Sequence, residues 1–272
     1  MITSTANKQV KQICNWIKSA KDRKSDQVFI AEGRKMFMEA PKDWIKAVYA
    51  SETFMKENEG NPVGERLKEF LTESVTDEVF TKMSDTRTPQ GVLCVLKRPA
   101  YDLSSITDVK APFLMVLEDI QDPGNLGTIV RTAEGAGVTG IIMSEGCVDI
   151  FNPKTIRSTM GSIYRMPFVY VPDVVGVVKD LNGKNITTYA AHLMGEEPYH
   201  AFDYRKPTAF LIGNEGNGLS DEITEAAKVF LRIPMEGEVE SLNAAIASAV
   251  LMYEAHRQRT TLKCLYDTLQ RP

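Results

Sequence analysis

Residues 113–137 read FLMVLEDIQDPGNLGTIVRTAEGAG and are expected to form a strand, a loop and a helix. The run FLMVLED is almost continuously apolar, and the segment TIVRTAEGAG has the apolar spacing of a helix packed on one side. Between them, Asp122, Pro123 and Gly124 form a turn sequence, and Asn125 stands where a side chain is expected to cap the helix. A strand that is apolar on both faces is typical of a parallel sheet covered by helices on both sides.

The same alternation of apolar strands and helices continues toward the C-terminus. Strands are expected at GIIMSEG, FVYVPD, NITTYAAHL, AFLIGNEG and VFLRIPM, and helices at NPKTIRSTMGS, VVGVVKDL, SDEITEAAK and SLNAAIASAVLMYEAHRQR. This order predicts an α/β fold with a mostly parallel sheet. Ligands bind such sheets at the carboxyl ends of strands, which makes EDIQDPGNLG, GNEGNGLS and MEGEVESLN the candidate binding loops.

The N-terminal third predicts a separate, smaller α/β domain. Its pattern comprises strands at VFIAEG, IKAVYAS and GVLCVLKRP, and helices around residues 5–21, at RKMFMEAP and at GERLKEFLTE. The polar segment YDLSSITDVKAP that follows has the character of a connector. Because 272 residues exceed one average domain, we expect a domain at residues 1–98, a linker at 99–111 and a second domain at 112–272.

Composition and cysteine usage exclude several classes of protein. Hydrophobic residues make up 43% of the chain and charged residues 25%, and no apolar run has membrane-spanning length. The first residues carry no apolar segment followed by a cleavage site, so we expect a soluble, cytoplasmic protein. The cysteines are widely separated and do not cluster with histidines, so neither a disulfide framework nor a metal site is expected; they are Cys14, Cys94, Cys147 and Cys264.

Charge is distributed unevenly along the chain. Residues 1–98 hold 17 basic and 14 acidic side chains, whereas the remainder holds 15 and 22. The first 24 residues contain six basic groups against the single acid Asp22, an excess that suits contact with phosphates. The alternative is a solvated helix face with Val10, Ile13 and Ile17 turned inward, and the two interpretations are compatible.

The loop GNEGNGLSDE, residues 213–222, lies between a buried strand and a helix start with acids near its positive end. Its glycine spacing differs from the dinucleotide fingerprint, and no lysine follows as in a phosphate-binding P-loop. Gly213, Gly216 and Gly218 permit positive φ or close approach of the backbone to a ligand, although a simple turn would use them too. Glu215, a carboxylate inside this glycine loop, favours a binding function.

The first and third loops contain further polar side chains that have ordinary structural alternatives. Ser241 is expected to cap the helix that follows the third loop, and Asn243 lies in its first turn, followed by small residues that permit close helix packing. Arg131 lies six residues after Asn125 and stays near the loop end of its helix. Spacing alone favours the structural alternative, in which Arg131 is a surface cation.

Taken together, NLGTIVRTAEGAG, LIGNEGNGLS and IPMEGEVESLNAAIASAVLMYE resemble the three ordered motifs of the SpoU/TrmH family of RNA ribose 2′-O-methyltransferases, within the SPOUT class. The resemblance covers about residues 113–258. The N-terminal third, at FIAEGRKMFMEA and SDTRTPQGVLCVL, is similar to the RNA substrate-binding domain that precedes many such enzymes. The resemblance implies an α/β fold with a deep trefoil knot, S-adenosylmethionine as cofactor, RNA as substrate and a homodimer.

The resemblance also implies roles for individual residues. The catalytic group is expected to comprise Arg131, Asn125, Glu215, Ser241 and Asn243, and the cofactor-binding group Leu211, Ile212, Gly213, Gly218, Ile233, Met235 and Leu242. RNA is expected to contact Lys8, Lys11, Arg34 and Arg131. Because a guanidinium stays protonated, we interpret Arg131 as a clamp for phosphate and ribose that stabilises developing negative charge on the 2′-oxygen, and not as the base.

Ribosomal RNA is the first expectation for the substrate and transfer RNA the second, with looped or single-stranded RNA as the expected form. A nonenzymatic RNA-binding or ribosome-assembly protein on the same fold is an alternative, which cofactor affinity would distinguish. A dinucleotide-dependent oxidoreductase is disfavoured because DPGNLG stands where GxGxxG would follow the first strand of the larger domain. A purely structural dimer would leave the glycine loop unexplained.

Overall fold

The computed structural model describes residues 1–192, 195–239 and 241–269, and in residues 261–269 only the backbone is described. The chain forms two compact units. The first combines Met1–Pro99 with Asp149–Tyr164, and the second combines Ala100–Val148 with the described residues from Arg165 onward. No helix in the described part of the chain has both the length and the apolar character needed to cross a membrane.

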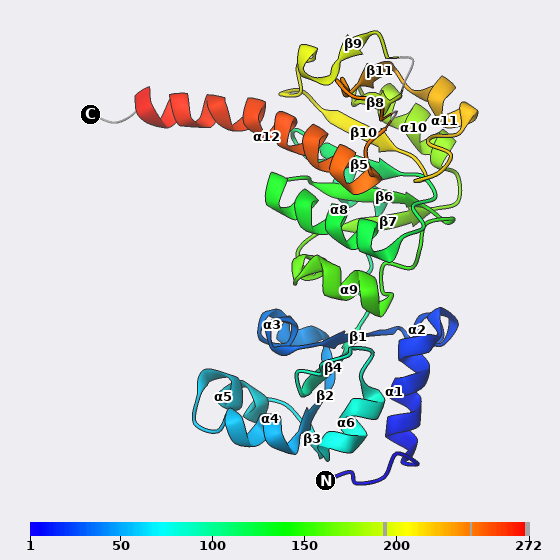
Figure 1. Ribbon diagram of the computed structural model, residues 1–272. Coiled ribbons are helices and arrows are strands. Elements are labelled where there is room, and N and C mark those ends of the chain that lie inside the picture. Colours follow the sequence, from blue (N-terminus) through cyan, green and yellow to red (C-terminus); the bar gives the residue numbers. More distant parts are fainter. Residues whose placement is uncertain (193–194, 240, 270–272) are drawn as a thin grey trace. The chain divides into compact units, whose positions relative to one another are not determined.

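The first unit contains a four-stranded sheet in the order β1-β4-β2-β3 (Figure 1). Strand β4 is antiparallel to both of its neighbours, and β2 and β3 are parallel. The strands are β1 (Val28–Glu32), β2 (Ile45–Ser51), β3 (Thr72–Val75) and β4 (Val92–Lys97). The helices are α1 (Lys8–Lys18), α2 (Ala20–Asp26), α3 (Arg34–Glu39), α4 (Glu52–Glu57), α5 (Pro62–Lys68), α6 (Asp77–Met83) and α9 (Pro153–Thr159), with short 3-10 turns η1 (Lys42–Trp44) and η2 (Ser162–Tyr164).

The second unit contains a seven-stranded sheet in the order β7-β6-β5-β10-β8-β11-β9. Every adjacent pair is parallel, which confirms the predicted parallel sheet. The strands are β5 (Phe113–Leu117), β6 (Gly140–Ser144), β7 (Phe168–Val171), β8 (Thr187–Ala191), β9 (Glu197–Pro198), β10 (Thr208–Ile212) and β11 (Val229–Arg232). The helices are α7 (Leu103–Thr107), α8 (Pro123–Ala136), α10 (Val174–Gly183), α11 (Asp221–Ala226) and α12 (Ala244–Leu269), with a 3-10 turn η3 (Tyr199–Ala201).

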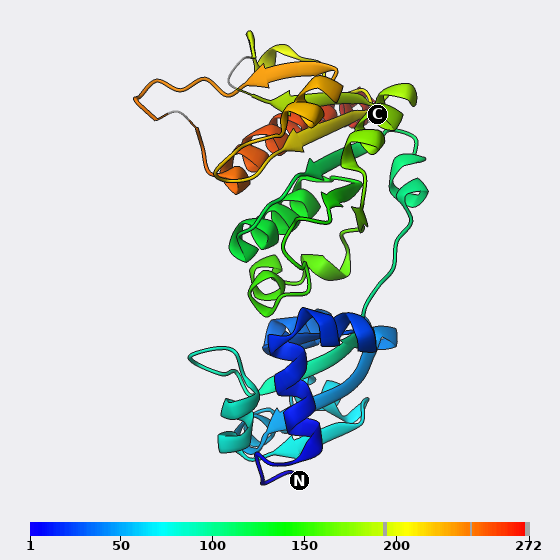
Figure 2. The same cartoon turned by 90° about the vertical axis from the view of Figure 1, so that its right-hand side faces the viewer.

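Helices cover both faces of the larger sheet. Alternate side chains of the central strands, including Leu114, Val116 and Leu211, form one core cluster with apolar residues of α10 and α11. On the other face, α12 runs alongside α8 and packs against it (Figures 1 and 2). Ala244, Ala245 and Ser248 are buried in the first turns of α12, and such small side chains permit a close approach.

The parallel register determines where loops meet. Strand β10 pairs with β5 through Ile212 and Leu117, and with β8 through Leu211 and Ala190. The carboxyl ends of these neighbouring strands therefore lie at one edge of the sheet, together with the loops that follow them. The trefoil knot that the resemblance implies stays a prediction.

Three segments differ from the sequence expectations. The connector expected at 99–111 contains helix α7, in which Ile106 is buried against the sheet, because one apolar side chain there suffices to anchor a short helix. The helix expected at GERLKEFLTE ends at Lys68, and Thr72–Val75 forms β3 instead. Residues Asp149–Tyr164, assigned by sequence to the second domain, group with the first unit, where Phe151 packs on Phe29 at a ring distance of 4.9 Å.

Arg23 belongs to the basic N-terminal segment, but it is 2% exposed and so is not available to phosphates. Its Nε and Nη2 donate to Asp149 Oδ2 at 3.2 and 2.7 Å. Its Nη1 donates to the carbonyl oxygens of Trp16 and Ile17 at 2.6 and 3.1 Å. The guanidinium thus joins the C-terminal end of α1 to the start of the Asp149–Tyr164 segment.

We predict that Asp149→Ala lowers the free energy of unfolding of the first unit by about 3 kcal/mol, because it leaves a buried guanidinium without its carboxylate. Both tryptophans of the chain, Trp16 and Trp44, lie in this unit, so tryptophan fluorescence during urea unfolding reports on it selectively. The control is Lys68→Ala, which removes an exposed ion pair with Glu65 and should leave the midpoint unchanged. Equal midpoints for the two variants would show that the buried pair contributes nothing.

Candidate active site

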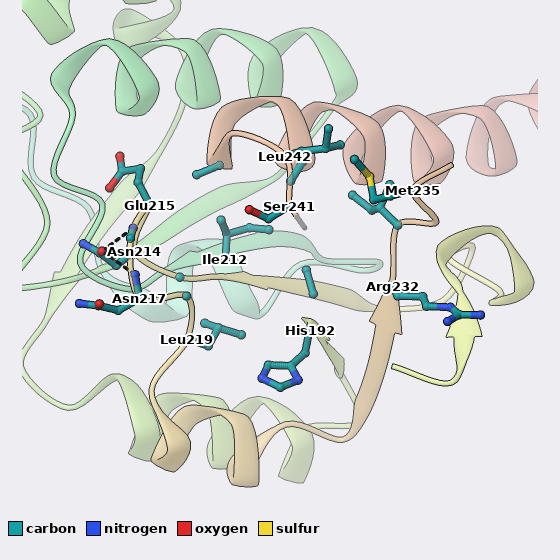
Figure 3. Close-up of a pocket in the computed structure, with 17 residues that line it drawn as sticks. His192, Ile212, Asn214, Glu215, Asn217, Leu219, Arg232, Met235, Ser241 and Leu242 are labelled. Carbon is teal, nitrogen blue, oxygen red and sulfur yellow. Dashed lines mark hydrogen bonds between the residues drawn. The ribbon is translucent and has the colours of Figure 1, made fainter. Parts of the chain in front are cut away.

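A cavity of about 340 Å³ lies at the carboxyl ends of β8, β10 and β11 (Figure 3). Figure 3 shows the Ile212 side chain between Leu242 and Ser241 on one side and His192 and Leu219 on the other. The lining comes from the end of β8, the glycine loop, the segment after β11 and the start of α12: Ala191, His192, Ile212, Gly213, Asn214, Glu215, Gly216, Asn217, Gly218, Leu219, Arg232, Ile233, Met235, Ser241, Leu242, Ala244 and Ala247.

The glycine loop is a tight reversal of the chain and also a wall of this cavity. The N–H of Asn214 donates to the carbonyl oxygen of Gly218 at 2.9 Å, and the N–H of Gly218 donates back to Asn214 at 2.9 Å. Gly218 has φ +73°, and a Cβ on Gly213 would lie 2.1 Å from the Gly218 backbone. Glycine is therefore required at both ends of the loop.

Glu215, near the tip of the glycine loop, reaches the loop that follows β5. Its Oε2 accepts from the N–H of Gln121 at 3.1 Å, and its Oε1 accepts from the N–H of Asp122 at 3.1 Å and from Asn125 Nδ2 at 2.9 Å. These donors lie at the N-terminal end of α8, where the helix dipole also favours an anion.

The protonation state of Glu215 follows from these contacts. Burial acts to raise the pKa of this carboxyl, but the hydrogen bonds from Asn125 and from the backbone outweigh it, so the pKa lies below its usual 4.5. A lowered pKa means that the carboxylate is ionised at neutral pH, and that its contribution to stability is lost only as the pH falls through that lowered value. Glu215 is therefore suited to accept hydrogen bonds and not to accept a proton at neutral pH.

Asn125 continues the connection to the third loop. Its Oδ1 accepts from Asn243 Nδ2 at 3.0 Å. Asn243 Oδ1 in turn accepts from the N–H groups of Ala245 at 2.9 Å and Ile246 at 3.3 Å, at the start of α12. Glu215, Asn125 and Asn243 thus form one hydrogen-bonded chain through all three candidate loops.

Two capping predictions are wrong. Helix α8 is capped by Asp122, whose Oδ1 accepts from the N–H of Asn125 at 2.8 Å, so Asn125 lies inside the first turn. Pro123, which has no N–H, occupies the first helical position, so the cap is Asp122, three residues before the predicted Asn125. Helix α12 is capped by Asn243 and not by Ser241, which stays exposed and lines the cavity. Glu240 in the third loop lies outside the described residues.

Most residues predicted to bind the cofactor line the cavity. They are Ile212, Gly213, Gly218, Ile233, Met235 and Leu242, and Glu215 and Ser241 of the predicted catalytic group join them. The prediction that Leu211 lines the cofactor site is corrected, because its side chain is fully buried in the core cluster between the sheet and helices α10 and α11. Successive side chains of a strand point to opposite faces, so Leu211 and Ile212 cannot both face the cavity.

Arg131 lies outside the cavity lining. It is an exposed residue of α8, more than one turn beyond Asn125, and no hydrogen bond or ion pair joins it to any residue that the structure describes. Thr128, one turn earlier, is exposed on the same helix. A free guanidinium at this position remains available to an anion from outside the protein.

The residues predicted to contact RNA from the N-terminal domain are all exposed. Lys8 and Lys11 lie on α1, and Arg34 is the first residue of α3, where its backbone N–H donates to Gln90 Oε1 at 2.9 Å. Val10 and Ile13 of α1 are buried, as the alternative interpretation of this helix requires. The two interpretations of the basic segment are therefore compatible, and contact of its lysines with RNA stays a prediction.

Several lining residues were not predicted from the sequence. Ala191 and His192 follow β8, and they reach the cavity because β8 is the neighbour of β10 in the sheet, an order that alternation of strands and helices does not reveal. Arg232 ends β11, which lies next to β8. Among the described residues, no cluster of three potential metal ligands is found, and Cys14, Cys94 and Cys147 are free thiols. The Cys264 side chain lies outside the described residues.

Two family models match the chain. Residues 112–253 match the SpoU rRNA Methylase family, and residues 7–94 match the MRM3-like substrate binding domain. A similar relative is the 23S rRNA (guanosine(2553)-2′-O)-methyltransferase RlmP of Bacillus subtilis, 30% identical over 93% of this chain and 97% of its own length.

Solved structures agree with these matches. The AdoMet-bound rRNA methyltransferase of Sinorhizobium meliloti is 31% identical, with a TM-score of 0.81 over 94% of this chain and 97% of that one. The SpoU methyltransferase AviRb of Streptomyces viridochromogenes in complex with AdoMet is 27% identical, with a TM-score of 0.82 over 93% of this chain and 98% of that one. The resemblance noted from three loop motifs is thereby confirmed, and the chain belongs to the SpoU rRNA methylase family.

Proposed function

We propose that this protein is an S-adenosylmethionine-dependent methyltransferase that modifies a ribose 2′-hydroxyl in ribosomal RNA. The observation that carries the proposal is the hydrogen-bonded chain from Glu215 through Asn125 to Asn243, which joins three loops beside one cavity. The relatives named as 23S rRNA 2′-O-methyltransferases support the reaction, and favour ribosomal RNA over transfer RNA.

The cavity suits the proposed cofactor in size and in chemistry. Its volume of about 340 Å³ lies within the range of small-molecule sites. Ile212, Ile233 and Leu242 provide apolar walls for an adenine ring, and the glycine loop exposes backbone along another wall. When bound there, S-adenosylmethionine supplies an electrophilic methyl group on a sulfonium.

The chain's own residues would then hold the RNA and manage charge. Glu215 and Asn125 fix the start of α8, the helix that carries Arg131. Arg131, which stays protonated, would clamp a phosphate beside the target ribose and stabilise negative charge on the 2′-oxygen as its proton leaves to a phosphate or to water. Ser241 and Asn243 would hold the third loop against the target nucleotide.

The proposal predicts methyl transfer that depends on Arg131. Purified protein with tritiated S-adenosylmethionine should label unmodified ribosomal RNA, and the label should appear in an alkali-resistant dinucleotide. Arg131→Ala should lower turnover by about 10²-fold, the size expected for losing a charge-stabilising donor, and Arg131→Lys should restore only part of it.

The control is Arg205→Ala, which removes an exposed arginine paired with Asp203 and should keep full turnover. Full turnover by Arg131→Lys would contradict a bidentate clamp. Label confined to transfer RNA would contradict the substrate, and absence of both labelling and cofactor binding would favour the nonenzymatic alternative.

We also propose that the first unit binds RNA through its basic helix. Lys8 and Lys11 are exposed on α1, and the family match of residues 7–94 to a substrate-binding domain supports this role. An RNA-directed role for the protein is also consistent with the cytoplasmic location expected from the sequence.

Replacing Lys8 and Lys11 together by glutamine should weaken binding to a ribosomal RNA transcript and reduce the salt dependence of binding. Each lysine that neutralises a phosphate contributes roughly 0.7 to the slope of log affinity against log salt. Filter binding over a salt series measures both quantities. The matched control replaces Lys56 and Lys68, which are exposed in the same unit, and an equal effect in both double variants would rule out a specific surface.

We further propose that the protein is a homodimer that pairs through the α8 and α12 face of the second unit. Ile246 and Tyr253 lie two turns apart on α12 and are each 51% exposed. Large apolar side chains aligned on one helix face are best covered by a second copy that offers the same face.

Sedimentation equilibrium should find a dimer, and Ile246→Lys should shift it toward monomer because a charge would be buried at the contact. The control is Leu71→Lys, at an apolar residue of the first unit that is 78% exposed and should not affect assembly. A monomer before substitution, or a dimer that survives Ile246→Lys unchanged, would contradict this interface.

A further inference from the structure

Asn214 is a residue of the glycine loop to which neither the motifs nor the proposed chemistry gives a role. Its side chain makes three hydrogen bonds. Oδ1 accepts from the N–H of Gly216 at 2.8 Å and of Asn217 at 3.1 Å, shown by the dashed lines of Figure 3. Nδ2 donates to the carbonyl oxygen of Asp119 at 2.8 Å.

The acceptor Asp119 is itself held in an unusual conformation. It follows β5 and has φ +53°, a left-handed conformation that is uncommon outside glycine. Its N–H donates to Ser144 Oγ at 2.9 Å, and Ser144 Oγ donates to Asp119 Oδ1 at 2.6 Å. Ser144 is the last residue of the neighbouring strand β6. Its hydrogen bonds with Asp119 therefore hold the Asp119 backbone in place at the carboxyl ends of β5 and β6.

Asn214 therefore joins the glycine loop to the segment that follows β5. By binding the N–H groups of Gly216 and Asn217 it sets the curvature of the loop, and by binding Asp119 it sets the position of the loop over β5. Glu215 is the next residue. Its carboxylate accepts from the N–H groups of Gln121 and Asp122, and these contacts depend on both the curvature and the position of the loop.

We infer that Asn214 is a positioning residue that places Glu215 and shapes the cofactor-binding wall of the cavity. The inference rests on the proposed function for its effect on cofactor binding. It requires an amide at this position, because the same side chain must accept from two N–H groups and donate to a carbonyl oxygen.

Asn214→Asp is the sharpest substitution, since it keeps the shape and the acceptor but places a second oxygen against the Asp119 carbonyl. It should weaken S-adenosylhomocysteine binding, measured by calorimetry, by about tenfold, and leave the KM for RNA within about twofold. The matched control is Asn185→Asp, the same change at an exposed residue. Asn185 precedes β8, so it lies at the amino-terminal end of that strand and away from the cavity, and the change should leave binding unchanged. Binding by Asn214→Asp equal to that of the control would overturn the inference.

A double-mutant cycle tests whether Asn214 acts through Glu215. If it does, Asn214→Ala and Glu215→Ala should each weaken S-adenosylhomocysteine binding, and the double variant should be little worse than the Glu215→Ala single variant. Fully additive losses would overturn a positioning role. Urea unfolding of each variant separates this effect from a general loss of stability.

A second readout does not depend on the cofactor. In the free protein, Asn214→Ala should accelerate amide hydrogen exchange of Gly216 and Asn217, whose N–H groups the side chain binds. Unchanged exchange would overturn the inference whatever the ligand. Faster exchange in a protein that binds no S-adenosylhomocysteine would instead retain the positioning role and refute the proposed cofactor.

Discussion

The carboxylate of Glu215 is the contact on which the site depends, because it joins two loops that are 90 residues or more apart in the chain. Its donors are N–H groups at the start of α8 and an amide that also binds the cap of α12. Backbone donors at a helix start have no partner inside the helix, so an ionised acceptor there satisfies groups that would otherwise need water. One side chain therefore fixes the start of one helix, the wall of the cavity and, through Asn125, the start of a second helix.

More of the fold than of the candidate site can be predicted from the sequence. The apolar runs and the alternation of strands with helices are enough to predict the parallel sheet. FLMVL and TAFLI are fully buried strands, as their composition indicates. The predicted caps Asn125 and Ser241 are wrong by three and two residues, because several neighbouring side chains in each loop are good caps and the choice depends on tertiary contacts. The site residues at the end of β8 could not be predicted, since strand order is a property of long-range pairing that alternation leaves open.

The segment Asp149–Tyr164 shows a different limit of sequence analysis. Its helix α9 is predictable from Asn152 and Pro153, which cap and begin it. Its partners are not, because Asp149 meets Arg23 and Phe151 meets Phe29 across more than 120 positions of sequence. A contiguous boundary drawn from composition cannot describe a chain that returns to its first unit, and the buried state of Arg23 follows from that return.

Three arginines illustrate how environment decides the use of one side chain. Arg23 is buried and neutralised by Asp149. Arg259 of α12 donates to the carbonyl oxygens of Tyr204, Lys206, Ala111 and Pro112, and stacks 4.6 Å from the Phe113 ring centroid, so its donors hold the helix to the amino ends of β5 and β10. Arg131 has neither kind of partner among the described residues, although it follows a helix start that is held in place by Glu215. A guanidinium supported on a rigid helix and left without an internal acceptor keeps its planar set of donors for a phosphate, which is the ligand that RNA offers.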